Sequence, residues 1–140
     1  MREENYPVKL VSAEEANSLL PRIRRTLASL RELRKRVLRT EAQIEIEEMT
    51  GSGPNSELSK EAEAAIAGQM AVLQDLSRHF EDMLEELQSE GAFLKDLETG
   101  LVDFYSRRGS DIVFLCWRED EKEVDHWHPL EGGFRNRELL

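Results

Sequence analysis

The final third of the chain concentrates residue types that bind metals or act as nucleophiles. The segment FLCWREDEKEVDHWHP, residues 114–129, contains the only cysteine, both tryptophans and two of the three histidines. Cys116, His126 and His128 offer thiolate and imidazole donors, which suit zinc or another divalent metal of borderline softness. These three residues are therefore the candidate metal ligands of the sequence.

The register of the hairpin that carries these residues decides whether they meet. His126 and His128 are two positions apart, so they point to the same face of a strand. A three-residue loop at 120–122 places Cys116 opposite His126, on that same face, whereas a two-residue turn sends Cys116 to the other face. Neither turn contains the Asn-Gly or Asp-Gly pair that favours a tight two-residue hairpin. The sequence therefore leaves the choice between the two loop lengths open and slightly favours the three-residue loop.

A complete zinc site needs a fourth group, for which Glu131, Asp103 and water are the candidates. The competing interpretation is that Cys116 is a small buried hydrophobic residue, the tryptophans fill a core or an interface, and the histidines lie at the sheet rim. Nucleophilic Cys/His chemistry is the weakest option, because the linear sequence places no thiolate-stabilising cation or helix N-terminus beside Cys116.

A second candidate site would bind a small anion. The guanidinium groups of Arg135 and Arg137, near the indole of Trp127, could hold a carboxylate or a phosphate through paired hydrogen bonds. The competing interpretation is that these arginines pair with the many acidic residues nearby.

Two long helices are predicted to precede these candidates. In SAEE, residues 12–15, the serine and the last glutamate can form a capping box, which starts a helix that runs to about Met49. Pro21 predicts a kink or break near the start of that helix. A second helix is predicted from about 57 to 90, where apolar residues recur at the three-four spacing of a coiled coil. The turn-forming residues 50–56 connect the two.

The two predicted helices carry opposite charges, the first basic and the second acidic, which favours an antiparallel hairpin. Each buried leucine contributes roughly 1.5–3 kcal/mol and each exposed ion pair only about 0–1 kcal/mol, so the apolar seam stabilises the hairpin. Helices of about 30 residues extend about 45 Å, further than the rest of the chain can cover. We therefore expect part of the apolar stripe to meet another subunit, which gives a homodimer or a higher homo-oligomer.

The remaining residues predict a small antiparallel sheet over 92–128. Its core strand is the apolar run DIVFLCW, residues 111–117, and EKEVDHW, residues 121–127, is the returning strand that Pro129 ends. The predicted fold class is α+β: a long, coiled-coil-like antiparallel helical hairpin packed with a small antiparallel sheet.

These elements fit one domain over residues 1–140, because this length is typical of a single domain. The hairpin spans 12–90, the sheet spans 92–128 and a tail occupies 129–140.

Composition excludes several classes of partner. A net charge of -10 opposes binding to phosphate backbones, so a nucleic-acid partner is not expected. One cysteine cannot form an internal disulfide, and no apolar run approaches the roughly 20 residues that cross a bilayer. The N-terminus also lacks the apolar core of a signal peptide, so we expect a cytoplasmic protein.

Four segments occur together in one collinear combination over nearly the whole chain. They are EEANSLLPRI (14–23), KDLETGLVDF (95–104), VFLCWRE (113–119) and WHPLEGGFRNR (127–137). This combination resembles an uncharacterised family of small bacterial proteins, classified only as a domain of unknown function. The resemblance implies a bacterial cytosolic protein with no assigned reaction.

The shared motifs cover Asp103, Cys116, Trp117, Trp127, His128, Phe134 and Arg137. In the family the place of His126 is commonly aromatic, and a glycine often follows the LCW segment where this chain has Glu119-Asp120-Glu121. A metal site shared with relatives would then use Cys116 and His128, with Asp103 as a further candidate.

No motif assigns a reaction, which favours a non-enzymatic role. The first hypothesis is an oligomeric interaction or scaffold protein that assembles through its apolar stripe. The first alternative is a metal-binding domain or metalloenzyme centred on Cys116, His126 and His128. The second alternative is a protein that binds small anions at Arg135 and Arg137.

Overall fold

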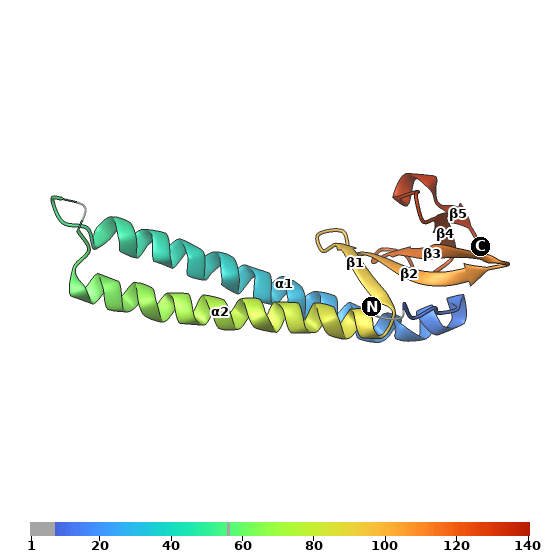
Figure 1. The fold of residues 1–140 in the computed structure, drawn as a ribbon, viewed down its shortest axis with the longest axis horizontal. Coiled ribbons are helices and arrows are strands. Elements are labelled where there is room, and N and C mark those ends of the chain that lie inside the picture. The colour runs from blue at the N-terminus through green and yellow to red at the C-terminus, as the bar shows by residue number, and fades with distance from the viewer. Residues whose placement is uncertain (1–7, 56) are drawn as a thin grey trace, which may run out of the picture. The chain divides into compact units, whose positions relative to one another are not determined.

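The structure, a computed structural model, describes residues 8–55 and 57–140. Its elements are helices α1 (Ala13–Thr50) and α2 (Lys60–Ser89), strands β1 (Ala92–Asp96), β2 (Leu101–Arg108), β3 (Asp111–Arg118) and β4 (His126–Pro129), the 3-10 helix η1 (Phe134–Asn136) and strand β5 (Glu138–Leu139). The strands form one antiparallel sheet in the order β1-β2-β3-β4-β5 (Figure 1). The predicted α+β fold, two long packed helices with a small antiparallel sheet, is confirmed. No helix in the described part of the chain has the length and apolar character that a membrane span requires.

The chain divides into two compact units, and both long helices contribute to each of them. The sheet unit comprises the described residues up to Ala28 together with Met83–Leu140. The hairpin unit comprises Ser29–Asp82, with the connector between the helices.

Buried apolar residues on one side of each helix hold the hairpin unit together. Leu30, Leu33 and Ile44 are buried on α1, and Leu76 is buried on α2. This pattern is the seam that the sequence predicts for antiparallel helices. The seam therefore provides the main apolar contact between the two helices of this unit.

The connector of the hairpin is held by two local features. A side chain at Gly51 would collide with Ala62, so the close approach of the connector to α2 requires glycine here. The Ser59 hydroxyl accepts the Ala62 N–H at 3.0 Å and caps the start of α2.

The start of α1, in the sheet unit, follows one prediction and departs from another. The Glu15 N–H donates to the Ser12 hydroxyl at 3.0 Å and the Ser12 N–H donates to the Glu15 carboxylate at 2.8 Å, so the predicted capping box is present. Of the kink or break predicted at Pro21, the break is wrong, because α1 runs through this residue without interruption. The flanking Leu20 and Ile23 are both buried, and their packing offsets the single backbone hydrogen bond that proline removes.

One face of the sheet forms the core of the sheet unit. Val102 and Phe104 on β2 and Trp117 on β3 are fully buried on this face. The Arg24 guanidinium of α1 lies over the Trp117 ring, 4.9 Å from its centroid, and donates to the Glu121 carbonyl at 2.9 Å. The first turns of α1 therefore pack against the sheet and also hold the loop that follows β3.

That loop is longer than the sequence predicts. The returning strand was expected from residue 121, yet β4 begins at His126 and residues 119–125 are irregular. The Val124 N–H donates to the Asn17 side-chain oxygen at 2.6 Å, and the Asn17 amide donates to the Val124 carbonyl at 3.4 Å. Because a side chain of α1 satisfies these backbone groups, they do not need a partner strand.

Residues 129–140, expected as a tail, add an edge strand to the sheet. Strand β5 pairs with β4, with Leu139 opposite His126 and Glu138 opposite Trp127. The Leu140 N–H donates to the Asp125 carbonyl at 2.9 Å. The tail therefore pairs with a strand edge that would otherwise present open backbone groups.

Candidate metal centre

The observed register places the candidate ligands on one face of the sheet. Cys116 lies opposite His126 on β4 and opposite Asp103 on β2. Residues paired across an antiparallel ladder share a face, and residues two apart on a strand do so as well. Asp103, Cys116, His126 and His128 therefore belong to the same face, the arrangement that the longer of the two predicted loops required.

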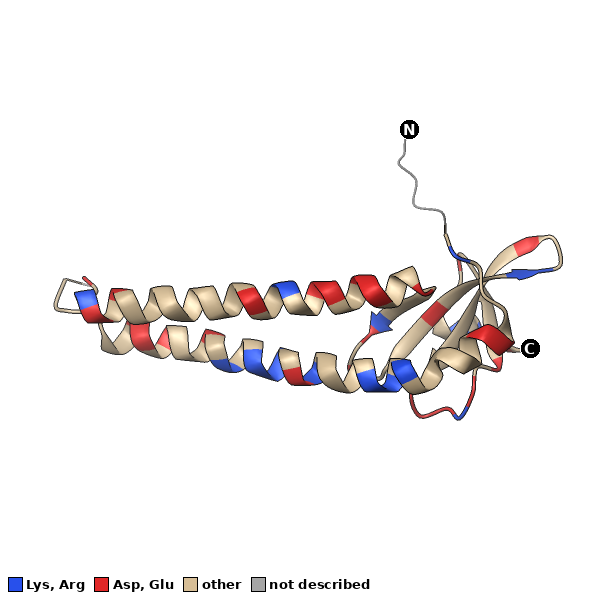
Figure 2. Ribbon diagram, turned by 90° about the horizontal axis from the view of Figure 1, so that it is seen from below, with Lys and Arg blue, Asp and Glu red and all other residues tan. Residues whose placement is uncertain are grey.

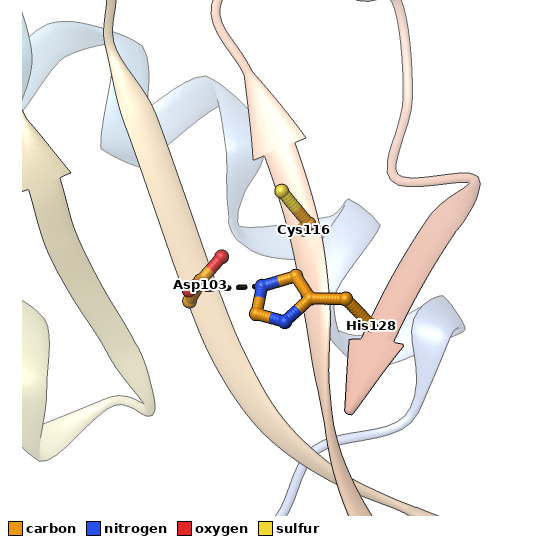
Figure 3. Close-up of side chains that lie close together, drawn as sticks. All are labelled: Asp103, Cys116 and His128. Carbon is orange, nitrogen blue, oxygen red and sulfur yellow. Dashed lines mark hydrogen bonds and ion pairs between the residues drawn. The ribbon is translucent and has the colours of Figure 1, made fainter. Parts of the chain in front are cut away.

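Three of these residues form a compact buried group. One oxygen of Asp103, the sulfur of Cys116 and one nitrogen of His128 all lie within 4.8 Å of one another, on neighbouring strands β2, β3 and β4 (Figure 3). Their relative exposures are 5%, 1% and 2%. We name this group, Asp103 with Cys116 and His128, the Asp-Cys-His cluster.

The hydrogen bonds of His128 fix the orientation of its ring. Nδ1 lies 2.8 Å from the carbonyl oxygen of Pro129, and a carbonyl can only accept, so Nδ1 carries a proton. Nε2 lies 3.3 Å from Oδ2 of Asp103. The Phe114 ring packs beside the imidazole with 5.3 Å between centroids. His128 therefore directs Nε2 into the cluster while the backbone holds its other nitrogen.

The Asp103 carboxyl is only partly satisfied. Burial raises the pKa of Asp103 above its ordinary value of 3.8, and the nearby charge of His128 opposes that rise. Oδ1 is buried and accepts no hydrogen bond within the described residues. A buried carboxyl oxygen without a partner is costly, and a bound cation would satisfy it.

Cys116 is a neutral thiol in this environment. The pKa of the thiol is raised from 9.0 to about 12, first by burial and then by the negative charge of Asp103, while Arg137 opposes the rise. Both nitrogens of His128 face oxygens, of Pro129 and Asp103, so His128 does not act as a base toward the sulfur. The arrangement does not fit nucleophilic catalysis, which needs an accessible thiolate.

His126 turns to different partners despite its position opposite Cys116. Its Nδ1 lies 2.7 Å from Asp125 Oδ1 and 3.8 Å from Glu121 Oε2. These three side chains form a second group, which is less buried. Glu131, a candidate fourth ligand, is exposed. Of the three predicted metal ligands, the structure thus brings Cys116 and His128 together with Asp103, one of the candidates for the fourth ligand.

The candidate anion site is distributed over different contacts. Both terminal nitrogens of Arg137 donate to the Glu121 carboxylate, and its guanidinium lies 4.0 Å from the centroid of the Phe134 ring. Trp127 instead stacks with Arg108, at 4.5 Å, and Arg135 is exposed. Arg137 and Trp127 therefore have separate partners and do not form one site.

The contact between Arg137 and Glu121 was not singled out from the sequence, where the only signal was a general excess of acids near these arginines. In the structure the side chain of Glu121 links the loop after β3 to Arg137 of the C-terminal segment. Its carboxylate also accepts the Arg118 N–H at 2.9 Å.

Comparison with curated proteins and comparison with solved structures each found no match. A family model described as "Uncharacterized conserved protein (DUF2203)" matches residues 9–140, a range that includes the whole sheet and the Asp-Cys-His cluster. The chain therefore belongs to the DUF2203 family of uncharacterised conserved proteins.

Proposed function

We propose that the protein binds a divalent metal ion of borderline softness, represented by Zn²⁺, through Asp103, Cys116 and His128. The orientation of His128 carries the proposal. Histidines that bind metals usually donate their second ring N–H to a carbonyl or a carboxylate, and His128 makes that bond to Pro129. Its remaining nitrogen then lies within 4.8 Å of a carboxylate oxygen and a sulfur.

The donor set favours zinc or a similar ion over magnesium or calcium. Thiolate and imidazole suit zinc, cobalt and nickel, whereas magnesium and calcium prefer oxygen ligands alone. A carboxylate and a thiolate together also balance the charge of a divalent ion. Three protein ligands leave one position of a tetrahedral ion for water or another small ligand.

Metal binding at this cluster must displace protons. The Cys116 thiol, whose pKa is raised to about 12, has to lose its proton to coordinate. The contact between His128 and Asp103 also holds a proton that the metal replaces. Because protons and metal compete for the same atoms, the affinity is expected to rise with pH.

A cobalt titration tests the proposal. The full chain, purified without a histidine tag and stripped with a chelator, is titrated with Co²⁺, which reports thiolate coordination by a charge-transfer absorption band. We expect one ion per chain with this band, and displacement of cobalt by Zn²⁺. Cys116→Ser should lose the band because it removes the thiolate, and His128→Gln should weaken cobalt binding by about 10–100-fold or more.

Two matched variants locate the site. His79→Gln removes an exposed histidine of α2 and should leave binding unchanged. His126→Gln should also retain the band, because His126 faces Asp125 and Glu121 rather than Cys116. Absence of the band in the unaltered protein, or an unchanged cobalt affinity of His128→Gln, would remove the proposal.

A further inference from the structure

The outer side of α1 in the hairpin unit carries a second apolar stripe, formed by Leu38, Ala42, Ile46 and Met49. Leu38 is 56% exposed, Ile46 58% and Met49 78%, and Ala42 is exposed as well. Steps of four, four and three residues align these side chains along one side of a helix. We call this set the outer stripe.

The outer stripe points away from the seam with α2. Leu33 and Ile44 are buried on the seam side. At 3.6 residues per turn the outer stripe is centred on nearly the opposite side of α1 from these residues. The packing of the two helices within one chain therefore does not cover it.

The charges around the outer stripe change sign along the helix. Residues 31–39 carry five basic side chains and one acidic one, and residues 41–48 carry four acidic side chains and no basic one. The blue and red bands of α1 follow this division (Figure 2). Ala42, a small residue, lies near the boundary between the two halves.

This division favours a second copy of the same helix in the antiparallel direction. A two-fold axis near Ala42 sets the basic half of each α1 against the acidic half of the other, so the favourable pairing occurs twice. The same axis brings Leu38 next to the partner subunit's Ile46 and buries both stripes. A parallel arrangement would oppose like charges along the whole contact.

We propose that the outer stripe of α1 docks a second copy of this chain in an antiparallel, two-fold symmetric contact. The contact buries apolar side chains that are more than half exposed in the single chain. It lies wholly within the hairpin unit, so it does not depend on the Asp-Cys-His cluster.

Sedimentation velocity and light scattering test this contact. The unaltered chain should be a dimer at micromolar concentration. Leu38→Glu combined with Ile46→Glu should raise the dissociation constant about a hundredfold or more, because in the symmetric contact the two changes replace four apolar side chains with charged ones. Val72→Glu alters a 43%-exposed apolar residue of α2 and should leave the dimer intact. Circular dichroism checks that all variants remain helical.

Charge exchange tests the direction of the contact. One variant carries Arg34→Glu and Arg39→Glu, and another carries Glu45→Lys and Glu48→Lys. Each of these two variants should dimerise more weakly than the unaltered chain. An equimolar mixture of the two should form a heterodimer. A chain that carries all four changes should recover the homodimer. A monomeric unaltered chain, or two charge variants that stay apart when mixed, would overturn the proposal.

Discussion

Nε2 of His128 lies 3.3 Å from Oδ2 of Asp103. Because Nδ1 already donates to the Pro129 carbonyl, this second contact is a hydrogen bond only if the pair holds one further proton. The proton is on the imidazole, which then faces a carboxylate, or on the carboxyl, which then donates to a neutral ring. The contact therefore joins the two buried side chains through a single proton.

The first prediction concerns Asp103→Asn. Burial raises the pKa of Asp103 above 3.8, so the folded protein keeps this proton at pH values where the unfolded chain has lost it. The stability that Asp103 contributes is fully present at pH values below its pKa in the unfolded chain. This contribution is lost as the pH rises through the pKa of Asp103 in the folded protein. Asn does not titrate, so the free energy of unfolding of Asp103→Asn, relative to the unaltered protein, should increase as the pH rises.

Urea unfolding of the metal-free protein, measured from about pH 3 to about pH 7, checks this expectation across the ordinary carboxyl range. Asp111→Asn, which changes an exposed carboxyl at the start of β3, is the control and should show no such trend. A stability difference for Asp103→Asn that stays constant with pH would contradict a raised pKa for Asp103.

The second prediction concerns the Cys116 thiol. Its pKa is raised from 9.0 to about 12, mainly by burial, so the thiol stays protonated in the folded protein where the unfolded chain ionises. The associated stability is present below pH 9.0 and is lost as the pH rises from there toward about 12. Cys116→Ala should be less stable at neutral pH because it leaves a cavity. Its free energy of unfolding should nevertheless fall less steeply than that of the unaltered protein as the pH rises above 9.0.

A thiol reagent provides an independent measurement. Cys116 is 1% exposed and should react with the reagent only as fast as the sheet opens. Addition of Zn²⁺ should slow the reaction further. Immediate stoichiometric modification of the folded protein would be incompatible with this environment.

The helices are the part of the fold that local sequence determines best. The capping box at Ser12 and the three-four spacing of apolar residues act between neighbouring turns, so they can be recognised without knowledge of the fold. Pro21 shows the limit of such reasoning, because burial of Leu20 and Ile23 by tertiary packing keeps the helix continuous.

The candidate site depends on contacts between distant residues. The position of Cys116 opposite His126 follows from the register, but residues 119–125 are held by Asn17, which is over 100 positions away. The His126 ring turns toward that loop, a direction that strand alternation alone does not give. Asp103 reaches the cluster through the turn between β2 and β3, where Gly109 has a φ of 65°.

The third prediction concerns the contact between Glu121 and Arg137. Burial alone would raise the pKa of Glu121, but hydrogen bonds from Arg137 and the Arg118 N–H outweigh it and lower the pKa below 4.5. The stability linked to this group is present above the unfolded pKa and is lost as the pH falls through the folded pKa. Glu121→Gln should therefore cost about 1–3 kcal/mol at neutral pH and progressively less in acid.

Arg137→Lys should also destabilise the protein, because an ammonium group cannot reproduce the two parallel hydrogen bonds to Glu121. Urea unfolding at several pH values measures both variants. Glu131→Gln, at an exposed position, is the control and should be neutral. Equal stability of Glu121→Gln and the unaltered protein at neutral pH would show that this contact does not anchor the C-terminal segment.

The fourth prediction concerns Asn17, which holds the loop before β4. Its side-chain oxygen accepts the Val124 N–H at 2.6 Å, and Val124 itself is 3% exposed. Asn17→Ala leaves this buried N–H without an acceptor, which should cost about 1–3 kcal/mol and speed hydrogen exchange at the Val124 amide. Because the loop leads directly into β4, the affinity of the Asp-Cys-His cluster for Co²⁺ should fall as well.

Two variants separate this effect from a general weakening of α1. Asn17→Asp keeps an acceptor for the Val124 N–H but loses the donor to the Val124 carbonyl. Its stability and the protection of its Val124 amide should therefore lie between those of Asn17→Ala and those of the unaltered protein. Ser18→Ala changes the exposed neighbour, whose hydroxyl bonds only within its own helix turn, and should leave Val124 protected. Unchanged exchange at Val124 in Asn17→Ala would mean that β3 and β4 set the loop by themselves, without help from α1.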